Sequence, residues 1–341
     1  MTSSLSPATA ALFAALLAAA ITPVPAHAAT LEVGPGRAFD RPSAAARTAQ
    51  DGDTIAIDPG DYYDCAVWSR NRLTITGTGT GGTPGAVITD TTCQGKALFI
   101  TRGDDIAIRN LTFTRARVPD HNGAGIRAEG RNLTVESSRF LNNETGLLEG
   151  DQPGSTLRII DCTFTANGVR EATTPSPALS VGAIATLHVE RSRFTDSRGG
   201  AHILSAAGRT ELLGNRIEDD ETGVRDALVV LNGGTLLMEE NTLRRGPGGA
   251  RFNAAVHAYG DAGEMEFRRN TLTNASGRQV ALLLDWSGSD AGFDANMLQP
   301  GDVERSTEGY WRQWAIGTAR ALYGGTRHLA GSALRATGAI K

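Results

Sequence analysis

One six-position pattern of apolar and polar residues recurs through the middle of the chain. It consists of an apolar residue, two variable residues, a small or amide residue, one variable residue and a second apolar residue. The eight copies occupy residues 108–113, 135–140, 159–164, 189–194, 212–217, 238–243, 267–272 and 293–298. Their last residues are 27, 24, 30, 23, 26, 29 and 26 positions apart. A period in this range, with β-type local alternation, predicts a solenoid.

The fourth position of the pattern predicts a ladder of side chains. In the second half of the repeat it holds Asn215, Asn241, Asn270 and Asn296. Stacked amides donate and accept hydrogen bonds from coil to coil, which satisfies a polar side chain at an inward bend. We therefore interpret these asparagines as structural.

A second strand follows a variable turn in each coil. Its clearest copies are residues 97–100, 125–128, 227–230 and 281–284. The turns contain Gly, Asn, Asp and Pro, whereas leucine-rich and ankyrin-type repeats need a helix in every unit. The pattern therefore favours an all-β solenoid of parallel strands over the helical repeat classes.

The N-terminal part of the chain resembles a known superfamily. Residues 43–50 form an Ala-rich helix candidate, and D-G-D-T-I-A-I at 51–57 and P-G-D-Y at 59–62 follow it. Here the chain resembles the pectate-lyase-like superfamily, whose members often begin with a capping helix, a G-D-T-I strand and a P-G-x-Y turn. The resemblance implies a single-stranded right-handed parallel β-helix over residues 29–302, and the helix would cover one end of its core.

The ends of the chain differ from this domain. Residues 1–28 lack charged side chains and end in Ala26-His27-Ala28, so we expect a secretory signal and a periplasmic or secreted protein. No later transmembrane segment is expected. Residues 303–341 are expected to form a C-terminal cap or flexible tail, with a helix over 306–323. This tail carries six basic residues against two Glu, so the body before it is acidic and is not expected to bind nucleic acid through charge.

Three cysteines are present. In an oxidising compartment Cys65 and Cys93 are the natural disulfide pair, because they flank one 27-residue stretch. Cys162 falls at a core position of the repeat, where a free thiol packs as a small hydrophobe.

The variable turns carry the polar residues that are candidates for a binding groove. In a β-helix, successive turns project from a rigid stack and suit an extended polymer. A solvated loop face would have the same composition. The substrate-binding candidates are Asn122, Asn143, Arg170, Arg198, His202, Arg225, Asp226 and His257.

The candidate catalytic residues are grouped around one turn. A lyase or epimerase acting on a uronate must neutralise the carboxylate and remove the neighbouring proton. His121 is the candidate base, and Asp120, Arg127 and Glu144 are its candidate partners. The metal remains open: Ca²⁺ would fit the oxygens of the run 219–221 with Asp226, although a solvated turn has the same sequence.

Comparison with enzyme motifs leaves the activity open. The N-T-D, G-H-G and R-I-K motifs of β-helix polygalacturonases and the D-P-H motif of mannuronan epimerases are absent. The stretch 116–127 looks like that of a group of exported bacterial β-helix proteins, which implies a polar column on the outward strand face. We align Pro177, Ala178, Leu204, Ala206 and Val229 there, so the column is apolar in this chain.

These observations predict an exported β-helix that binds or processes an acidic polysaccharide, by lyase or C5-epimerase chemistry if it is catalytic. The alternative is a non-catalytic scaffold or envelope-assembly protein, which would bind a protein partner through its apolar face and C-terminal helix.

Overall fold

A computed structural model describes residues 28–79, 85–169, 176–219, 227–247 and 254–307. The helix candidate at 43–50 is confirmed as α1 (Pro42–Thr48), which lies at the N-terminal end of the stack. Within the described ranges, no helix is long and apolar enough to cross a membrane. The predicted C-terminal helix falls almost entirely outside these ranges.

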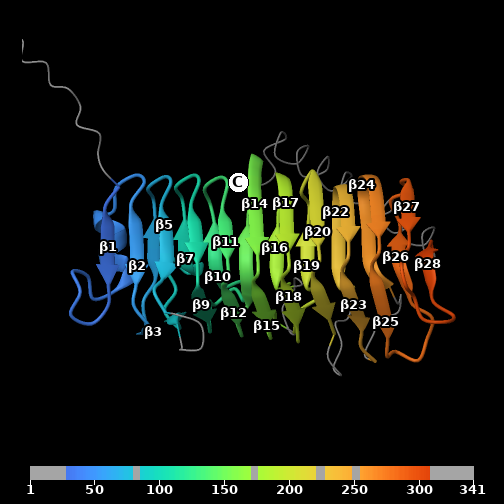
Figure 1. The fold of residues 1–341 in the computed structure, drawn as a ribbon, viewed down its shortest axis with the longest axis horizontal. Helices are drawn as coiled ribbons and strands as arrows, with labels where there is room; N and C mark the ends of the chain where they lie inside the picture. Colours follow the sequence, from blue (N-terminus) through green and yellow to red (C-terminus); the bar gives the residue numbers. More distant parts are fainter. Residues whose placement is uncertain (1–27, 80–84, 170–175, 220–226, 248–253, 308–341) are drawn as a thin grey trace, which may run out of the picture.

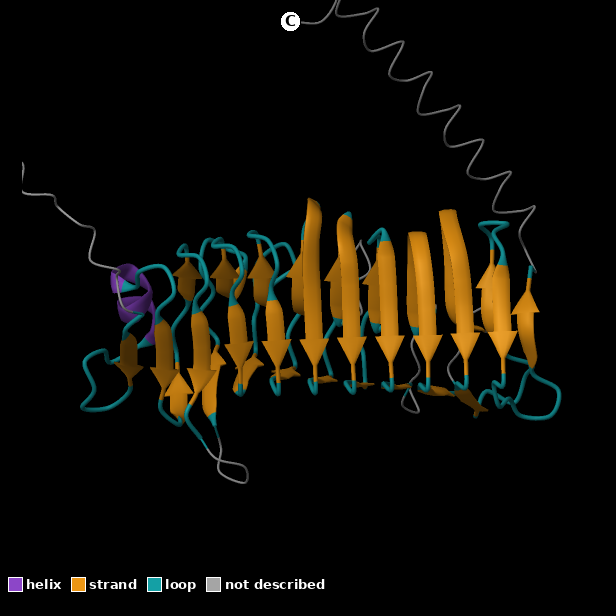
Figure 2. Cartoon of the chain, turned by 45° about the horizontal axis from the view of Figure 1, so that its top comes forward, coloured by secondary structure: helices purple, strands orange, loops and turns teal. Residues whose placement is uncertain are grey.

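The described chain winds into coils stacked along one long axis, and each full coil contributes a strand to three faces (Figures 1 and 2). All the pairings between strands are parallel. The first face contains β4 (Ala66–Trp68), β7 (Ala97–Thr101), β10 (Ala124–Ala128), β13 (Thr145–Glu149), β16 (Leu179–Val181), β19 (Ile203–Ser205), parts of β22 (Val229–Glu239) and β24 (Ala254–Arg268), β26 (Ala281–Asp285) and β28 (Val303–Ser306).

The second face follows the first in each coil, and the long strands β22 and β24 run through both. It contains β1 (Thr30–Val33), β2 (Thr54–Ile57), β5 (Thr74–Gly77), β8 (Ala107–Arg109), β11 (Thr134–Glu136), β14 (Gln152–Ile160), β17 (Ile184–Glu190), β20 (Arg209–Leu213), the ends of β22 and β24, and β27 (Ala291–Asp294).

The third face is a separate sheet. It contains β3 (Gly60–Tyr62), β6 (Ala86–Thr89), β9 (Leu111–Thr114), β12 (Arg139–Leu141), β15 (Thr163–Thr165), β18 (Arg193–Thr195), β21 (Arg216–Glu218), β23 (Thr242–Arg245) and β25 (Thr271–Asn274). The stack also continues beyond the predicted boundary at residue 302, because β28 pairs with β26.

The predicted repeat register is confirmed. The first apolar position of every copy pairs with the next along the second face, from Ile108 and Val135 to Phe267 and Phe293. The last apolar position forms a column on the third face, in which Phe140 and Phe164 stack with ring centroids 4.5 Å apart. This separation is close to the spacing of neighbouring strands, so each ring lies on the ring below it.

The asparagine ladder is also confirmed. Nδ2 of Asn215 donates to Oδ1 of Asn241 at 3.1 Å, and Asn241 donates to Asn270 at 2.9 Å. Each of these amides also donates to a backbone carbonyl of the preceding coil. Asn270 donates to Asn296 in the same way, so the predicted run of four is continuous.

The cysteines behave as expected. Cys65 and Cys93 form a disulfide that links the turn before β4 to the turn before β7. Cys162 is buried in the core, and burial raises the pKa of its thiol to about 12, so this thiol remains protonated and packs as an apolar group.

One buried acid makes the fold sensitive to pH. Glu149 is 1% exposed, and its Oε1 accepts a hydrogen bond from the Ser155 hydroxyl at 2.8 Å, whereas Oε2 has no hydrogen-bond partner. Burial raises the pKa of Glu149 from 4.5 to about 7, because the charged form is poorly solvated in the core. The fold therefore favours the protonated acid.

We expect Glu149→Gln to remove a pH-dependent loss of stability. Neutral Glu149 contributes on the order of 3 kcal/mol to the free energy of unfolding. This contribution is fully present below about pH 4.5 and is lost as the pH rises through about 7. Denaturant unfolding at several pH values should show this decline in the parent chain but not in the variant. Glu304→Gln, at an exposed position, is the control; equal pH profiles for parent and Glu149→Gln would contradict the assignment.

Candidate functional site

The turn between β9 and β10 holds the predicted base, and a carboxylate fixes the shape of this turn. Oε2 of Glu144 accepts hydrogen bonds from the backbone N–H groups of Val118 and Gly123, at 3.0 and 2.8 Å. Oε1 lies 3.4 Å from Nδ1 of His121. The side chain of Glu144 is 4% exposed and that of His121 is 62% exposed. Glu144 is therefore a positioning residue for the turn, and His121 faces solvent.

Arg127 follows this turn on β10, but it belongs to a different cluster. Its side chain lies on the outward side of the first face, and its Nε is 3.9 Å from Oε1 of Glu129. Lys96 also binds Oε1 of Glu129, and Arg102 donates to Oε2 at 2.9 Å. Within the described ranges, no hydrogen bond or ion pair joins His121 to Arg127. The structure therefore separates the predicted catalytic group into a turn and a neighbouring cationic cluster, which we define as Lys96, Arg102, Arg127 and Glu129.

The electrostatics of the cationic cluster favour an anion. Burial raises the pKa of Glu129, but the hydrogen bonds and positive charges of Lys96 and Arg102 outweigh it, and the pKa lies below the usual value. The cluster thus holds three cations against one ionised carboxylate. All four side chains retain access to solvent.

Sequence reasoning named only Arg127 from this cluster. Arg102 and Glu129 are one coil period apart, at 27 residues, and so are Arg109 and Glu136, which form an ion pair on the second face. Opposite charges at the repeat spacing are therefore the signal that would have found Glu129 and Arg102. Lys96 lies before β7, and its side chain crosses to the end of β10, a reach that spacing does not indicate.

Three predicted binding residues, Asn143, His202 and His257, are buried and must be reassigned. Asn143 is 1% exposed and donates to Oδ1 of Asn167, so it belongs to a second internal amide ladder. His202 is fully buried at an inward corner, in the column of Ala178 and Leu228. Gly125 and Gly146 occupy this corner in earlier coils, where a Cβ would lie within about 3 Å of the Phe rings.

His257 does not occupy the position of His202. It pairs with Val230 on the outward side of the first face, although it is only 3% exposed. The same register corrects Val229, which is buried in the core, so that Val230 holds the outward position instead. Because side chains alternate along a strand, an error of one residue exchanges inside and outside.

The remaining predicted residues lie on turns or outside the described residues. Asp120 and Asn122 are exposed beside His121, and Arg198 donates to Oδ1 of Asn142, which also accepts a hydrogen bond from Arg117. Arg170, Arg225 and Asp226 lie outside the described residues.

The acidic run considered for Ca²⁺ is only partly described. Asp219 is buried and accepts a hydrogen bond from Arg245 at 2.9 Å, so its carboxylate is paired rather than open to a cation. Residues 220 and 221 lie outside the described ranges. Within those ranges, His, Cys, Asp and Glu side chains form no group of three or more that could hold a metal ion.

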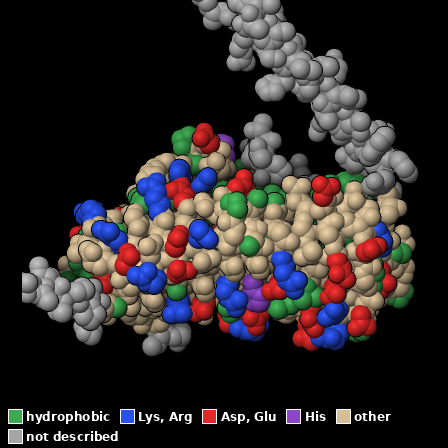
Figure 3. All heavy atoms as spheres, turned by 90° about the horizontal axis from the view of Figure 1, so that it is seen from above, with side chains coloured by type: hydrophobic (Ala, Val, Ile, Leu, Met, Phe, Trp, Pro, Cys, Tyr) green, Lys and Arg blue, Asp and Glu red, His purple; other side chains and the backbone are tan. Residues whose placement is uncertain are grey.

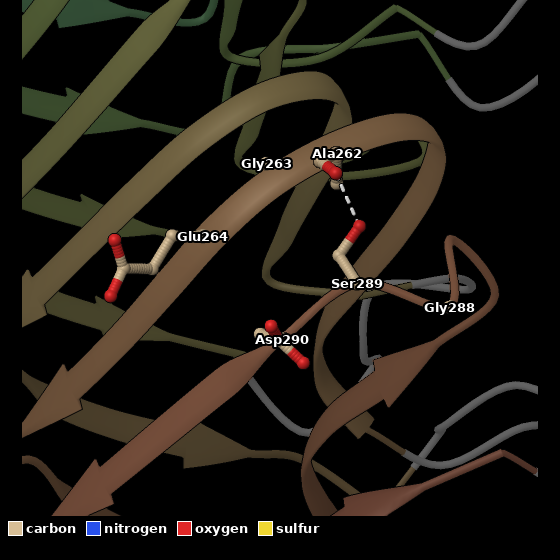
Figure 4. A pocket seen from close by; sticks show the side chains of 6 residues that line it. All are labelled: Ala262, Gly263, Glu264, Gly288, Ser289 and Asp290. Atoms are coloured by element: carbon tan, nitrogen blue, oxygen red, sulfur yellow. Dashed lines mark hydrogen bonds between the residues drawn. The ribbon is translucent and has the colours of Figure 1, made fainter.

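Two other surface features are weaker candidates. On the second face, His188 lies between two carboxylates, with Nδ1 2.9 Å from Glu211 and Nε2 3.3 Å from Glu190, so both ring nitrogens are engaged. An open depression lies between the middle of β24 and the turn that joins β26 to β27, and it is lined by Ala262, Gly263, Glu264, Gly288, Ser289 and Asp290. Figure 4 shows that the carboxylates of Glu264 and Asp290 do not converge, while Ser289 donates to the Ala262 carbonyl.

Comparison with known proteins identifies the fold. A family model described as the right-handed beta helix region matches residues 65–217. The fold of the chain is a right-handed parallel β-helix. No curated protein matches this β-helix significantly.

Solved structures agree at the level of architecture. The β-helix is similar to YbhC of Escherichia coli, with 11% identity, a TM-score of 0.51, and coverage of 81% of this chain and 86% of that one. An alginate lyase from Paenibacillus sp. str. FPU-7 matches at 15% identity and a TM-score of 0.47, covering 82% of this chain and 98% of that one. Pectin methylesterase PemA from Erwinia chrysanthemi matches at 12% identity and a TM-score of 0.43, covering 84% of this chain and 95% of that one. At these identities the likeness concerns the fold alone.

Proposed function

We propose that this β-helix binds an acidic polysaccharide on the outward side of its first face, at the cationic cluster. The observation that carries the proposal is the convergence of Lys96, Arg102 and Arg127 on the single carboxylate of Glu129. The sequence has a net charge of −4, so the sign of this local surplus is opposite to that of the whole molecule. The carboxylates of a uronate polymer are suitable partners for Arg and Lys side chains.

The shape of the face supports a polymer rather than a small anion. Arg127 lies on β10 of the first face, and the strands on either side of it repeat at about 4.8 Å along the axis. A chain of sugars can follow this face across successive coils. Figure 3 shows the molecule from above, with acidic and basic side chains interspersed toward the N-terminal end and again along the lower edge of the view.

The His121 turn neighbours the cationic cluster, and a sugar that contacts both would be positioned for catalysis. Glu144 contacts Nδ1 of His121, which is the arrangement of a histidine base oriented by a carboxylate. In an elimination, His121 would take the proton from C5 of a uronate. The C4–O4 bond would break, a C4=C5 double bond would form, and the leaving oxygen would take a proton from water. Arg127 and Lys96 would neutralise the uronate carboxylate beside the reacting carbon.

A second candidate function uses the same face differently. The outward column that contains Arg127 also contains Ile100, Leu148 and, further along, Leu204, so much of this column is apolar. Such a column favours a scaffold that binds a protein. Salt separates the two candidates, because binding of a charged polymer weakens as ionic strength rises, whereas apolar docking does not.

We further propose that the protein is exported to the periplasm or secreted. The uncharged N-terminal stretch supports this, and so does the Cys65–Cys93 disulfide, because such bonds persist in oxidising compartments. N-terminal sequencing of the protein from a producing cell should begin at Ala29; a cytosolic protein that retains Met1 would contradict the proposal.

The binding proposal predicts that Lys96→Ala combined with Arg127→Ala weakens binding to polygalacturonate or alginate at least about tenfold, a loss of roughly 1.4 kcal/mol. Titration calorimetry at low salt is the measurement. Arg109→Ala is the matched control, because Arg109 is a half-exposed arginine on the second face of a neighbouring coil. Unchanged affinity in the double variant, or an equal loss in the control, would reject the proposed site.

The catalytic proposal predicts a rise in ultraviolet absorbance from the unsaturated product when the protein is incubated with the polymer that it binds. His121→Ala should abolish the rise and leave binding within about twofold, because His121 is outside the cationic cluster. Binding without any rise would limit the function to recognition.

A further inference from the structure

A second outward feature lies on the first face, near its C-terminal end. Tyr259 on β24 and Trp286, directly after β26, pack edge to face with ring centroids 5.1 Å apart and planes at 67°. His257 supports both rings: its Nδ1 is 3.1 Å from the Tyr259 hydroxyl, and its ring centroid is 5.8 Å from that of Trp286. We define Tyr259, Trp286 and His257 as the aromatic platform.

The aromatic platform is not part of the main core. Trp286 packs against Ala254, Ala281 and Leu284, which form a separate apolar cluster on the outward side of the sheet. Tyr259 and Trp286 are partly exposed, whereas His257 beneath them is buried. Two supported aromatic rings at the surface, with polar atoms beside them, are suited to the C–H face and the hydroxyl groups of a sugar.

The aromatic platform and the cationic cluster lie in one line. Pairing runs in continuous register from Arg127 on β10 to His257 on β24. The outward residues between them are uncharged: Leu148, Ser180, Leu204 and Val230. Five coil steps separate the two strands, which is about 24 Å at the usual strand spacing.

We infer that the aromatic platform is a distal sugar-stacking subsite, and that the polysaccharide lies parallel to the β-helix axis between it and the cationic cluster. The spacing of neighbouring coils is close to the length of one pyranose unit in a 1,4-linked chain, so about one sugar would lie over each coil. The uncharged column between the two sites would then form the floor beneath the intervening sugars. This inference rests on the proposed function, and it assigns the direction of the bound polysaccharide and the approximate length of the binding site.

The test is the dependence of affinity on oligomer length. A uronate trimer is too short to reach both sites, whereas an octamer spans them. In the parent chain the octamer should bind at least about tenfold more tightly than the trimer. Trp286→Ala should remove most of this gain and leave trimer affinity within about twofold, while Trp286→Phe, which keeps an aromatic ring, should retain most of it.

The control is Met297→Ala, which removes an exposed apolar side chain at the same end of the stack but beside the third face. A full length-dependent gain in Trp286→Ala would overturn the subsite. An equal loss for trimer and octamer would also overturn it, because Trp286 would then support the shape of the whole face. Failure of the parent chain to bind any uronate oligomer would instead reject the proposed function.

Discussion

The structure depends on the hydrogen bonds between parallel strands of successive coils. These bonds fix the coils at one spacing and in one register, so each side chain lies directly over the equivalent side chain of the coil before it. The side chains of each column must therefore be able to pack against, or hydrogen-bond to, the equivalent side chains of the neighbouring coils. Phenylalanines satisfy this condition by stacking, and asparagines satisfy it because one amide both donates and accepts. A buried charge does not satisfy it, and Asp219 is buried only where the next coil supplies Arg245.

The same constraint explains which parts of the structure the sequence could predict. A column repeats one chemistry at one period, so the Phe column, the Asn ladder and the Cys65–Cys93 pair were all evident from spacing. The inward corner was less evident, because its chemistry changes along the axis. Gly125 and Gly146 leave room for Phe rings, and His202 and Leu228 occupy the corner beyond the last ring of the stack, Phe194.

The candidate site was harder to predict than the fold, for two physical reasons. Turn lengths vary between coils, so alignment by sequence drifts by one residue, and that is enough to exchange Val229 with Val230. In addition, a long side chain acts far from its own backbone. Lys96 and Glu129 are 33 residues apart, one directly before β7 and the other directly after β10, yet they meet in an ion pair. Periodicity indicates where a backbone position lies, but not where a flexible ammonium group ends.

The first and second faces differ in how their charges are arranged, and this difference is the reason to look for function on the first face. On the second face, acids and bases are matched, across coils in the pair Arg109–Glu136 and within β20 in the pair Arg209–Glu211. Exposed pairs of this kind contribute little to stability, and they cancel each other's field. On the first face, three cations share one carboxylate within a largely apolar column. Stability does not require this surplus, since each cation would be better solvated in water, whereas an anionic ligand would be held by it. The paired charges of the second face suit solubility, whereas the surplus of positive charge on the first face suits recognition of an anionic polymer.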